Sequence, residues 1–202
     1  MNQTTTVAVG LAPRGRSVAF DVVLVVVGSI VVALAAQLAI PLPFTTVPIT
    51  AQTLAVLLVG AALGWKRGSA ALVLYLAEGA AGLPVFAGAM AGPTHLFGST
   101  GGYLFGFVAA AALVGWLAER RWCASVVGAL AAMALGTAVI FICGVAWLAA
   151  MLGPAAAVQA GLVPFIPGAV LKIAAGAVAA PVARRLLARL GALIGLQSDF
   201  TQ

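Results

Sequence analysis

Six long apolar stretches, separated by short polar or Pro/Gly-rich segments, dominate the pattern of hydrophobic and polar positions along the chain. A helix needs about 20 mostly apolar residues to cross the hydrocarbon core of a bilayer, so these stretches predict membrane-spanning helices. Two of them are short, and one is long enough to tilt or bend. The expected spans are, approximately, 18–40, 49–63, 69–81, 103–118, 123–151 and 163–187.

The composition also indicates a membrane protein. Of the 202 residues, 64% are hydrophobic and only 7% are charged, whereas soluble domains carry about 25% charged residues. Six spans use nearly the whole chain and leave no room for a soluble catalytic or nucleic-acid-binding domain. We therefore predict an all-α integral membrane protein with an N-terminal tail at 1–17, a six-helix membrane domain at 18–190 and a C-terminal tail at 191–202.

The basic residues set the predicted orientation. Six crossings place both termini on one side of the bilayer, and every Lys or Arg except Lys172 falls on that side. Cytoplasmic loops are enriched in Lys and Arg, so both termini are expected in the cytoplasm. The net charge of +6 then needs no nucleic acid or lipid partner. The residues on this side are Arg14, Arg16, Lys66, Arg67, Arg120, Arg121, Arg184, Arg185 and Arg189.

Irregular Pro/Gly-rich loops are predicted on the outer side. Residues 41–48 contain three prolines in the run Pro-Leu-Pro-Phe-Thr-Thr-Val-Pro, which cannot continue a helix. Residues 82–102 are rich in glycine, longer than an ordinary connection and too apolar for a solvated tail. We expect this glycine-rich loop to fold back into the bundle, where irregular backbone is tolerated if it is buried or lines a cavity.

Lys172 is a lone cation in an otherwise apolar run from Ala169 to Ala180. A cation in the bilayer core costs roughly 2.5–3.5 kcal/mol on insertion scales, so such residues usually face a bundle interior or a wet cavity. Lys172 is therefore expected to bind an anionic ligand group, the alternative being that it snorkels to the outer interface. An outward-facing pocket for a small molecule is predicted around it. The other polar residues of the outer half are Thr45, Thr46, Thr50, Gln52, Glu78 and Tyr103.

Other polar residues keep two interpretations each. Gln52 is either a ligand contact or an interhelical hydrogen-bonding residue. Glu78 is either a solvated interfacial carboxylate or a partner of Lys172. Asp21 is expected in an interfacial ion pair beside the basic residues of the N-terminal tail.

The aromatic residues and the lone histidine are also open to two interpretations. Phe86, Phe97 and Tyr103 are either core aromatics or a lid over a ring-shaped ligand. His95 lies in the glycine-rich loop and is expected to be solvated or hydrogen-bonded. A single histidine without ligands at suitable spacing makes no metal site.

The chain lacks the motifs of a self-sufficient enzyme or pump. It contains no HExxH, no GxxxxGK[ST] and no base paired with a serine nucleophile. We predict no catalytic residue, no metal and no cofactor. Active transport would need another subunit or an ion gradient.

Four linked motifs, in order and with fitting spacing, resemble the BioY family. This family supplies the biotin-binding membrane subunit of energy-coupling-factor vitamin transporters. The resemblance covers about residues 20–185. Its motifs are Ile40–Gln52 (IPLPFTTVPITAQ), Gly79–Phe86 (GAAGLPVF), Gly98–Tyr103 (GSTGGY) and Pro164–Gly168 (PFIPG) followed by Lys172.

The resemblance implies a six-helix subunit in the bacterial inner membrane that captures biotin from outside with high affinity. It would work with a transmembrane coupling protein and ABC ATPases, which hydrolyse the ATP. Ala35 and Ala39 would belong to the small-residue motif that docks the coupling protein. The substrate-binding residues implied are Thr50, Gln52, Glu78, Phe86, Tyr103, Phe165, Ala169 and Lys172.

One position departs from the family pattern. The family reads Pro-Gly-Asp-x-x-Lys, with the aspartate in the biotin site, whereas this chain has Ala169 there. An unpaired urea donor would cost about 1–3 kcal/mol, which is roughly a ten- to hundredfold loss of affinity. The alternative is that Glu78 substitutes. The rival functions are capture of a different vitamin, a membrane-embedded enzyme, and a structural membrane subunit with no ligand.

Overall fold

The long apolar stretches form long helices. The structure is a computed structural model that describes residues 18–193, with side chains described as far as residue 186. Five helical stretches are long and apolar enough to cross a membrane, which confirms a mostly helical membrane protein. The long helices are α1 (Val18–Gln37), α2 (Gln52–Ala80), α4 (Gly101–Glu119), α5 (Val126–Leu152) and α7 (Ile166–Leu193).

Short elements connect these helices. The predicted tail at 1–17 lies outside the described residues, and α7 continues to Leu193, into the predicted C-terminal tail. The connecting elements are β1 (Ala39–Leu42), β2 (Thr45–Thr50), η1 (Ala87–Ala89), α3 (Pro93–Leu96), η2 (Trp122–Ala124), α6 (Pro154–Gly161) and η3 (Val163–Phe165).

Helix α2 is broken at Gly64 and folds back on itself. Gly64 has φ 80° and ψ 177°, a conformation that favours glycine. A Cβ on Gly68 would lie 3.0 Å from the Cα of Gly60, although residues eight apart in a continuous helix are separated by about 12 Å. The predicted stretches 49–63 and 69–81 are thus two antiparallel halves of α2. The loop expected between them is reduced to the break at Gly64.

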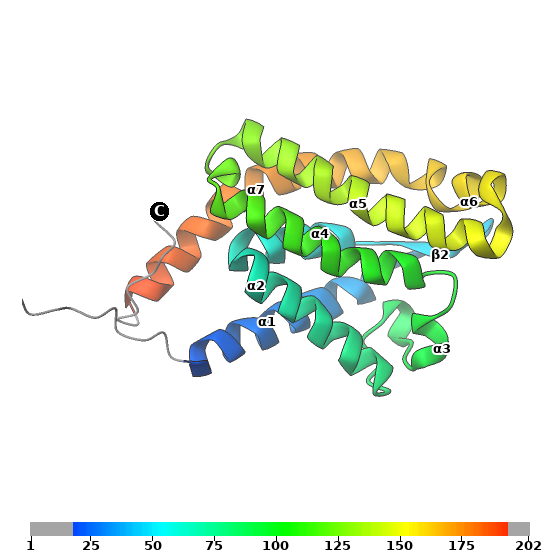
Figure 1. The fold of residues 1–202 in the computed structure, drawn as a ribbon, viewed down its shortest axis with the longest axis horizontal. Coiled ribbons are helices and arrows are strands. Elements are labelled where there is room, and N and C mark those ends of the chain that lie inside the picture. Colours follow the sequence, from blue (N-terminus) through cyan, green and yellow to red (C-terminus); the bar gives the residue numbers. More distant parts are fainter. Residues whose placement is uncertain (1–17, 194–202) are drawn as a thin grey trace, which may run out of the picture.

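Helix α4 packs between the α2 hairpin on one side and α5 on the other (Figure 1). Glycines permit the close approach. A Cβ on Gly60 would lie 2.6 Å from the carbonyl oxygen of Ala111, so α2 could not carry a larger residue at this position. Helix α7 packs against α5 and α2, while α1 packs mainly on α2. This arrangement leaves α4 the most buried of the long helices.

The Pro-rich segment after α1 forms an antiparallel β-hairpin, which the sequence analysis did not anticipate. Ala39 pairs with Thr50 and Leu42 with Thr45, with an irregularity in the register between these pairs. The expectation that the segment is not helical is confirmed. The Thr45 hydroxyl donates to the Ala160 carbonyl at 2.8 Å and fastens the hairpin to α6.

The hairpin corrects the geometry expected for the docking motif. Helix α1 ends at Gln37, and Ala39 belongs to β1. Ala35 and Ala39 therefore do not share a helical face as two residues four apart on one helix would. Ala35 itself is half-buried and packs against the core.

The glycine-rich loop folds back onto the bundle, as predicted. Phe86 is fully buried, and its ring fits against Gly79 of α2. Gln37 holds the loop to the end of α1: its Nε2 donates to the Phe86 carbonyl at 3.1 Å, and its Oε1 accepts from the Ala89 N–H at 3.1 Å.

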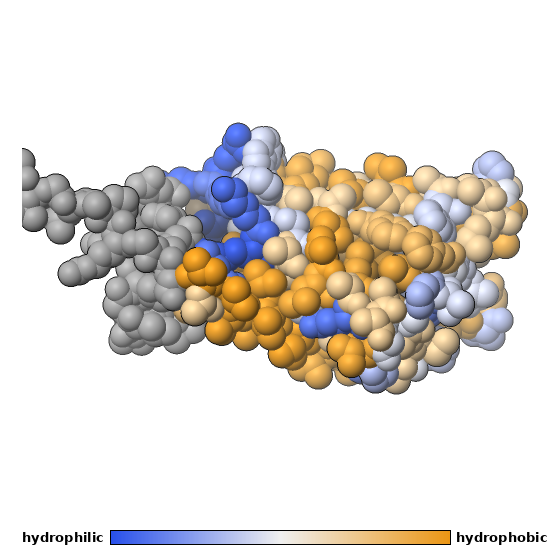
Figure 2. Space-filling view, turned by 60° about the horizontal axis from the view of Figure 1, so that its bottom comes forward, coloured by the Kyte–Doolittle hydropathy of each residue, from blue (hydrophilic) through white to orange (hydrophobic). Residues whose placement is uncertain are grey.

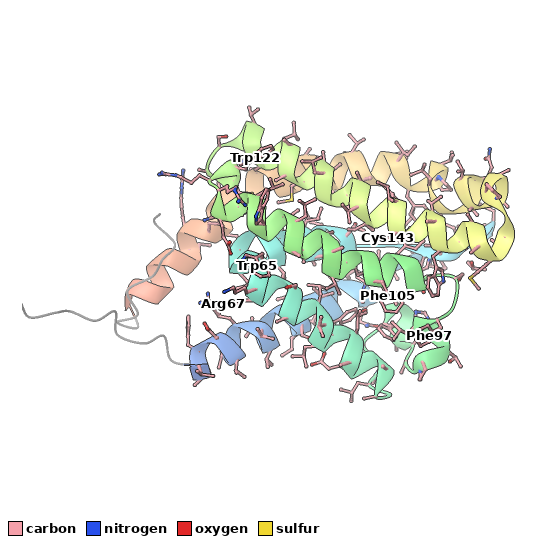
Figure 3. The ribbon with its side chains drawn as sticks, in the orientation of Figure 1. Trp65, Arg67, Phe97, Phe105, Trp122 and Cys143 are labelled. Atoms are coloured by element: carbon pink, nitrogen blue, oxygen red, sulfur yellow. The ribbon has the colours of Figure 1, made fainter. Side chains whose placement is uncertain are left out.

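Polar contacts gather several helix ends at one end of the molecule. Arg67 forms an ion pair with Asp21 at 2.8 Å, and the Glu119 carboxylate accepts from the Trp65 N–H at 3.1 Å. Asp21 thus pairs with Arg67. The tail arginines expected beside it lie outside the described residues. Figure 2 shows hydrophilic residues gathered toward this end beside a mostly hydrophobic surface, and Figure 3 places Trp65, Arg67 and Trp122 there.

We expect Gly79→Ala to destabilise the fold by about 1–3 kcal/mol, because overpacking a filled core forces side chains out of place. The added Cβ would overlap the buried Phe86 ring. The readout is the thermal unfolding midpoint in detergent. Gly168→Ala is the matched control, because no atom lies within 4 Å of its Cβ position and alanine favours a helix. An equal midpoint for the two variants would contradict the packing described for Phe86.

Candidate functional site

A cavity lies between the β-hairpin, the first half of α2, the glycine-rich loop and helices α4, α5 and α7. The space among these elements amounts to about 770 Å³, including space that is open to solvent. Most of its lining is apolar or aromatic. The lining residues are Val47, Pro48, Thr50, Gln52, Thr53, Leu57, Ala87, His95, Thr100, Tyr103, Leu104, Phe107, Thr137, Ile140, Phe141, Phe165, Ala169 and Lys172.

The structure brings most of the predicted site residues together around this cavity, from three separate parts of the chain. Glu78 and Phe86 are not among the lining residues. The predicted residues that do line it are Thr50, Gln52, Tyr103, Phe165, Ala169 and Lys172.

Lys172 lies in the second turn of α7 and reaches the junction of β2 and α2. Its Nζ donates to the Thr50 carbonyl at 2.5 Å. It therefore crosses between elements within the bundle, at the cavity wall. None of the described lining residues is acidic, so Lys172 gives this wall a positive character that suits an anionic or strongly polar acceptor.

Gln52 begins α2 beside the same residue. Its backbone N–H donates to the Thr50 hydroxyl at 3.3 Å, and that hydroxyl donates to Gln52 Oε1, also at 3.3 Å. Its Nε2 donates to the Tyr75 hydroxyl at 2.7 Å. Gln52 thus makes the interhelical hydrogen bond that the sequence offered as one interpretation, and it also lines the cavity.

Tyr103 contributes to the wall from the first turn of α4. Its hydroxyl donates to the Gly161 carbonyl at 2.7 Å, so its proton is already used within the protein. Gly144 of α5 has no side chain to compete with the Tyr103 ring. Together with Phe107, Phe141 and Phe165, this ring makes the cavity suitable for an apolar, ring-shaped ligand.

Glu78 and Phe86 have other partners. The Glu78 carboxylate accepts from the buried Ser29 hydroxyl of α1 at 2.5 Å. The Phe86 ring lies edge-on to Tyr75 and stacked on His95, with centroid distances of 5.5 and 5.1 Å. Phe86 is thus core packing for the glycine-rich loop, and Glu78 ties α1 to α2.

His95 lines the cavity, although its sequence context does not mark it as a site residue. It is half-buried and lies 3.5 Å from the Thr100 hydroxyl. Thr137 also lines the cavity, although its hydroxyl already donates to the Met133 carbonyl. A lone histidine in a glycine-rich loop carries no signal of its own in the sequence, because its place at the cavity depends on tertiary packing, which includes stacking on Phe86.

His95 should make stability depend on pH. Burial lowers the pKa of its imidazole below its usual value of 6.5. The unfolded chain therefore takes up this proton before the folded protein does. Stability should be full above about pH 6.5 and fall as the pH is lowered through the folded-state pKa.

Thermal unfolding between about pH 7.5 and 5.5 tests this expectation, since carboxylates titrate mostly below that window. His95 is the only histidine of the chain. In His95→Gln the midpoint should lose most of its pH dependence, and an unchanged slope would assign the dependence to another group.

The described residues contain no group of three or more His, Cys, Asp or Glu side chains placed to hold a metal ion. The cavity lining supplies hydrogen-bonding groups, one cation and apolar walls. This arrangement favours reversible binding of a small ligand that carries an apolar ring and a few polar groups.

Comparisons with known proteins agree on one family. The model of the BioY family matches residues 4–189. The Biotin transporter BioY of Thermotoga maritima is 39% identical over 148 residues, covering 73% of this chain and 85% of the relative. The Biotin transporter BioY of Rhizobium etli is 37% identical over 152 residues, covering 71% and 81%.

A solved structure has the same fold. It is the crystal structure of the S-component for biotin from an ECF-type ABC transporter, which is 25% identical to this chain. The TM-score is 0.75, and the match covers 83% of this chain and 92% of the other.

Proposed function

Because this chain belongs to the BioY family, we propose that it captures biotin from the outside as the substrate-binding subunit of an ECF-type ABC transporter. It is a transport protein and not an enzyme. The observation that carries the proposal is the cavity, in which aromatic walls surround a hydrogen-bond donor and an acceptor that both contact Thr50.

The ureido group of biotin suits this pair. A cyclic urea presents a carbonyl oxygen between two N–H groups. Lys172 Nζ would donate to the oxygen, and Gln52 Oε1 would accept from one N–H. The fused rings would lie against aromatic walls that include Tyr103 and Phe165, while Ala169 leaves the second N–H without the acceptor that the family aspartate supplies. Glu78 and Phe86 would act indirectly, through the packing of α1 and of the glycine-rich loop.

The proposed topology has six crossings with both termini in the cytoplasm of a bacterial cell. The α2 hairpin supplies two of them, since its halves run in opposite directions from Gly64. The Asp21–Arg67 pair and the contact of Arg184 with the Ala118 carbonyl bring the basic helix ends together. This clustering supports the positive-inside assignment of that end.

The proposed partners are a transmembrane coupling protein and ABC ATPases, which would supply the energy. Helix α1 is the natural docking element, because one of its faces is exposed and apolar. Ala35 stays a proposed docking position although it is half-buried and packs against the core, and Ala39 would take part through β1. The exposed residues of that face include Val22, Val26, Val27, Ile30 and Leu34.

Calorimetric titration of biotin into the detergent-purified protein tests the function. We expect saturable one-to-one binding of biotin and none of thiamine or riboflavin at the same concentrations. Binding of another vitamin instead would assign a different substrate. Absence of any heat or thermal stabilisation across the panel would favour a structural subunit.

A further inference from the structure

Tyr75 lies in the second half of α2, behind the cavity wall. It is fully buried, and Gln52 is 4% exposed. The Tyr75 hydroxyl oxygen lies 2.7 Å from Gln52 Nε2 and 3.3 Å from the Val85 carbonyl oxygen. Gln52 therefore connects Tyr75 directly to the cavity.

The direction of these hydrogen bonds follows from the donor inventory. A carbonyl can only accept, so the single proton of the Tyr75 hydroxyl goes to Val85. The tyrosine oxygen must then accept, and only the –NH₂ group of Gln52 can donate to it. This fixes the carboxamide with its Oε1 on the opposite side, beside the Thr50 hydroxyl at 3.3 Å.

We propose that Tyr75 is a positioning residue that holds the Gln52 carboxamide with its oxygen toward the cavity and thereby selects ligands carrying an N–H donor. One lone pair of Oε1 takes the Thr50 proton, and the second is available to the ligand. The flipped amide would present –NH₂ instead and select an acceptor. The inference rests on the proposed function, with the ureido N–H as the selected donor.

The test compares biotin with two analogues, each methylated on one ureido nitrogen. Wild type should prefer biotin over one of these analogues by about ten- to a hundredfold, the cost of a buried unpaired acceptor. Tyr75→Phe should reduce this preference to a few-fold, because the amide can then turn over. In a Gln52→Leu background the preference should be absent, and Tyr75→Phe should have no further effect.

Ser29→Ala is the matched control. It also removes a hydrogen bond of α2, the partly buried one to Glu78, and this bond does not involve Gln52. Its preference for biotin should equal that of wild type. If Tyr75 has a purely structural role, Tyr75→Phe and Ser29→Ala should both lower the stability of the protein, and neither should change its preference for biotin over the methylated analogue.

The outcomes separate the two proposals. If wild type does not bind biotin, the proposed function fails before Tyr75 is tested. If wild type binds biotin but Tyr75→Phe keeps the full preference, the positioning role is wrong. Should Tyr75→Phe fail to fold, Tyr75→Met takes its place, and an undiminished preference for biotin in that variant would likewise overturn the proposal.

Discussion

Replacing Lys172 with methionine is expected to weaken biotin binding about ten- to a hundredfold and to leave the ligand-free protein at least as stable. A hydrogen bond to a charged group contributes about 1.5–3 kcal/mol, which corresponds to this range of affinity. Removing a cation from the membrane-spanning part of α7 also removes its desolvation cost. The Thr50 carbonyl, which loses its 2.5 Å partner, offsets part of that gain.

Calorimetry gives the affinity, and thermal unfolding without ligand gives the stability. Biotin amide, which lacks the carboxylate, shows which ligand group Lys172 meets. If Lys172 meets the ureido oxygen, the variant should lose the same factor for biotin and for the amide. A loss confined to biotin would place the carboxylate at Lys172, and unchanged binding of both would remove Lys172 from the site.

The second large expected effect is a gain of affinity for biotin. Ala169→Asp should tighten biotin binding about ten- to a hundredfold, because the aspartate would accept the ureido N–H that alanine leaves unpaired. Ala169 lines the cavity one turn before Lys172, so the two side chains share a helical face. The aspartate could therefore also hold the lysine.

Calorimetric titration of wild type, Ala169→Asp and Ala169→Asn measures this gain, and the asparagine variant separates hydrogen bonding from charge. An affinity of Ala169→Asp no higher than that of wild type would mean that an existing group already accepts this N–H. Gln52 would be the first choice. Glu78, the substitute considered from sequence, is occupied by Ser29 and is not among the lining residues.

Much of the fold could be predicted because membrane insertion leaves a strong signal in sequence. Apolar length and the positions of Lys and Arg give the helices and their proposed direction. The β-hairpin at Ala39–Thr50 gave no such signal, because its prolines exclude helix without indicating strand. The abrupt reversal at Gly64 was also missed, since a basic pair follows it and suggested a longer loop.

Residues of the candidate site could be predicted where burying a polar or charged side chain costs free energy. Lys172 stood out for that reason, and Gln52 and Tyr103 came from the family motifs. His95 and Thr137 were missed because their side chains reach the cavity only through tertiary packing. Glu78 was implied as a ligand contact by the family resemblance, as a substitute for the missing aspartate, but its carboxylate accepts from Ser29 on a neighbouring helix and it does not line the cavity. The depth of a polar residue in the membrane indicates that its side chain needs a partner, but it does not indicate which group that partner is.

The break at Gly64 bears on how the chain enters the membrane during synthesis. The helical halves before and after it, 52–63 and 65–80, span only about 18 and 24 Å, respectively, whereas the hydrocarbon core is about 30 Å thick. Neither half is long enough to be released into lipid alone as a stable crossing. The two should therefore leave the translocon together, as a preformed pair, and only after enough chain has emerged to bring Tyr75 back beside Gln52. A ribosome stalled with only the first half exposed should hold a segment that has not yet partitioned into the bilayer.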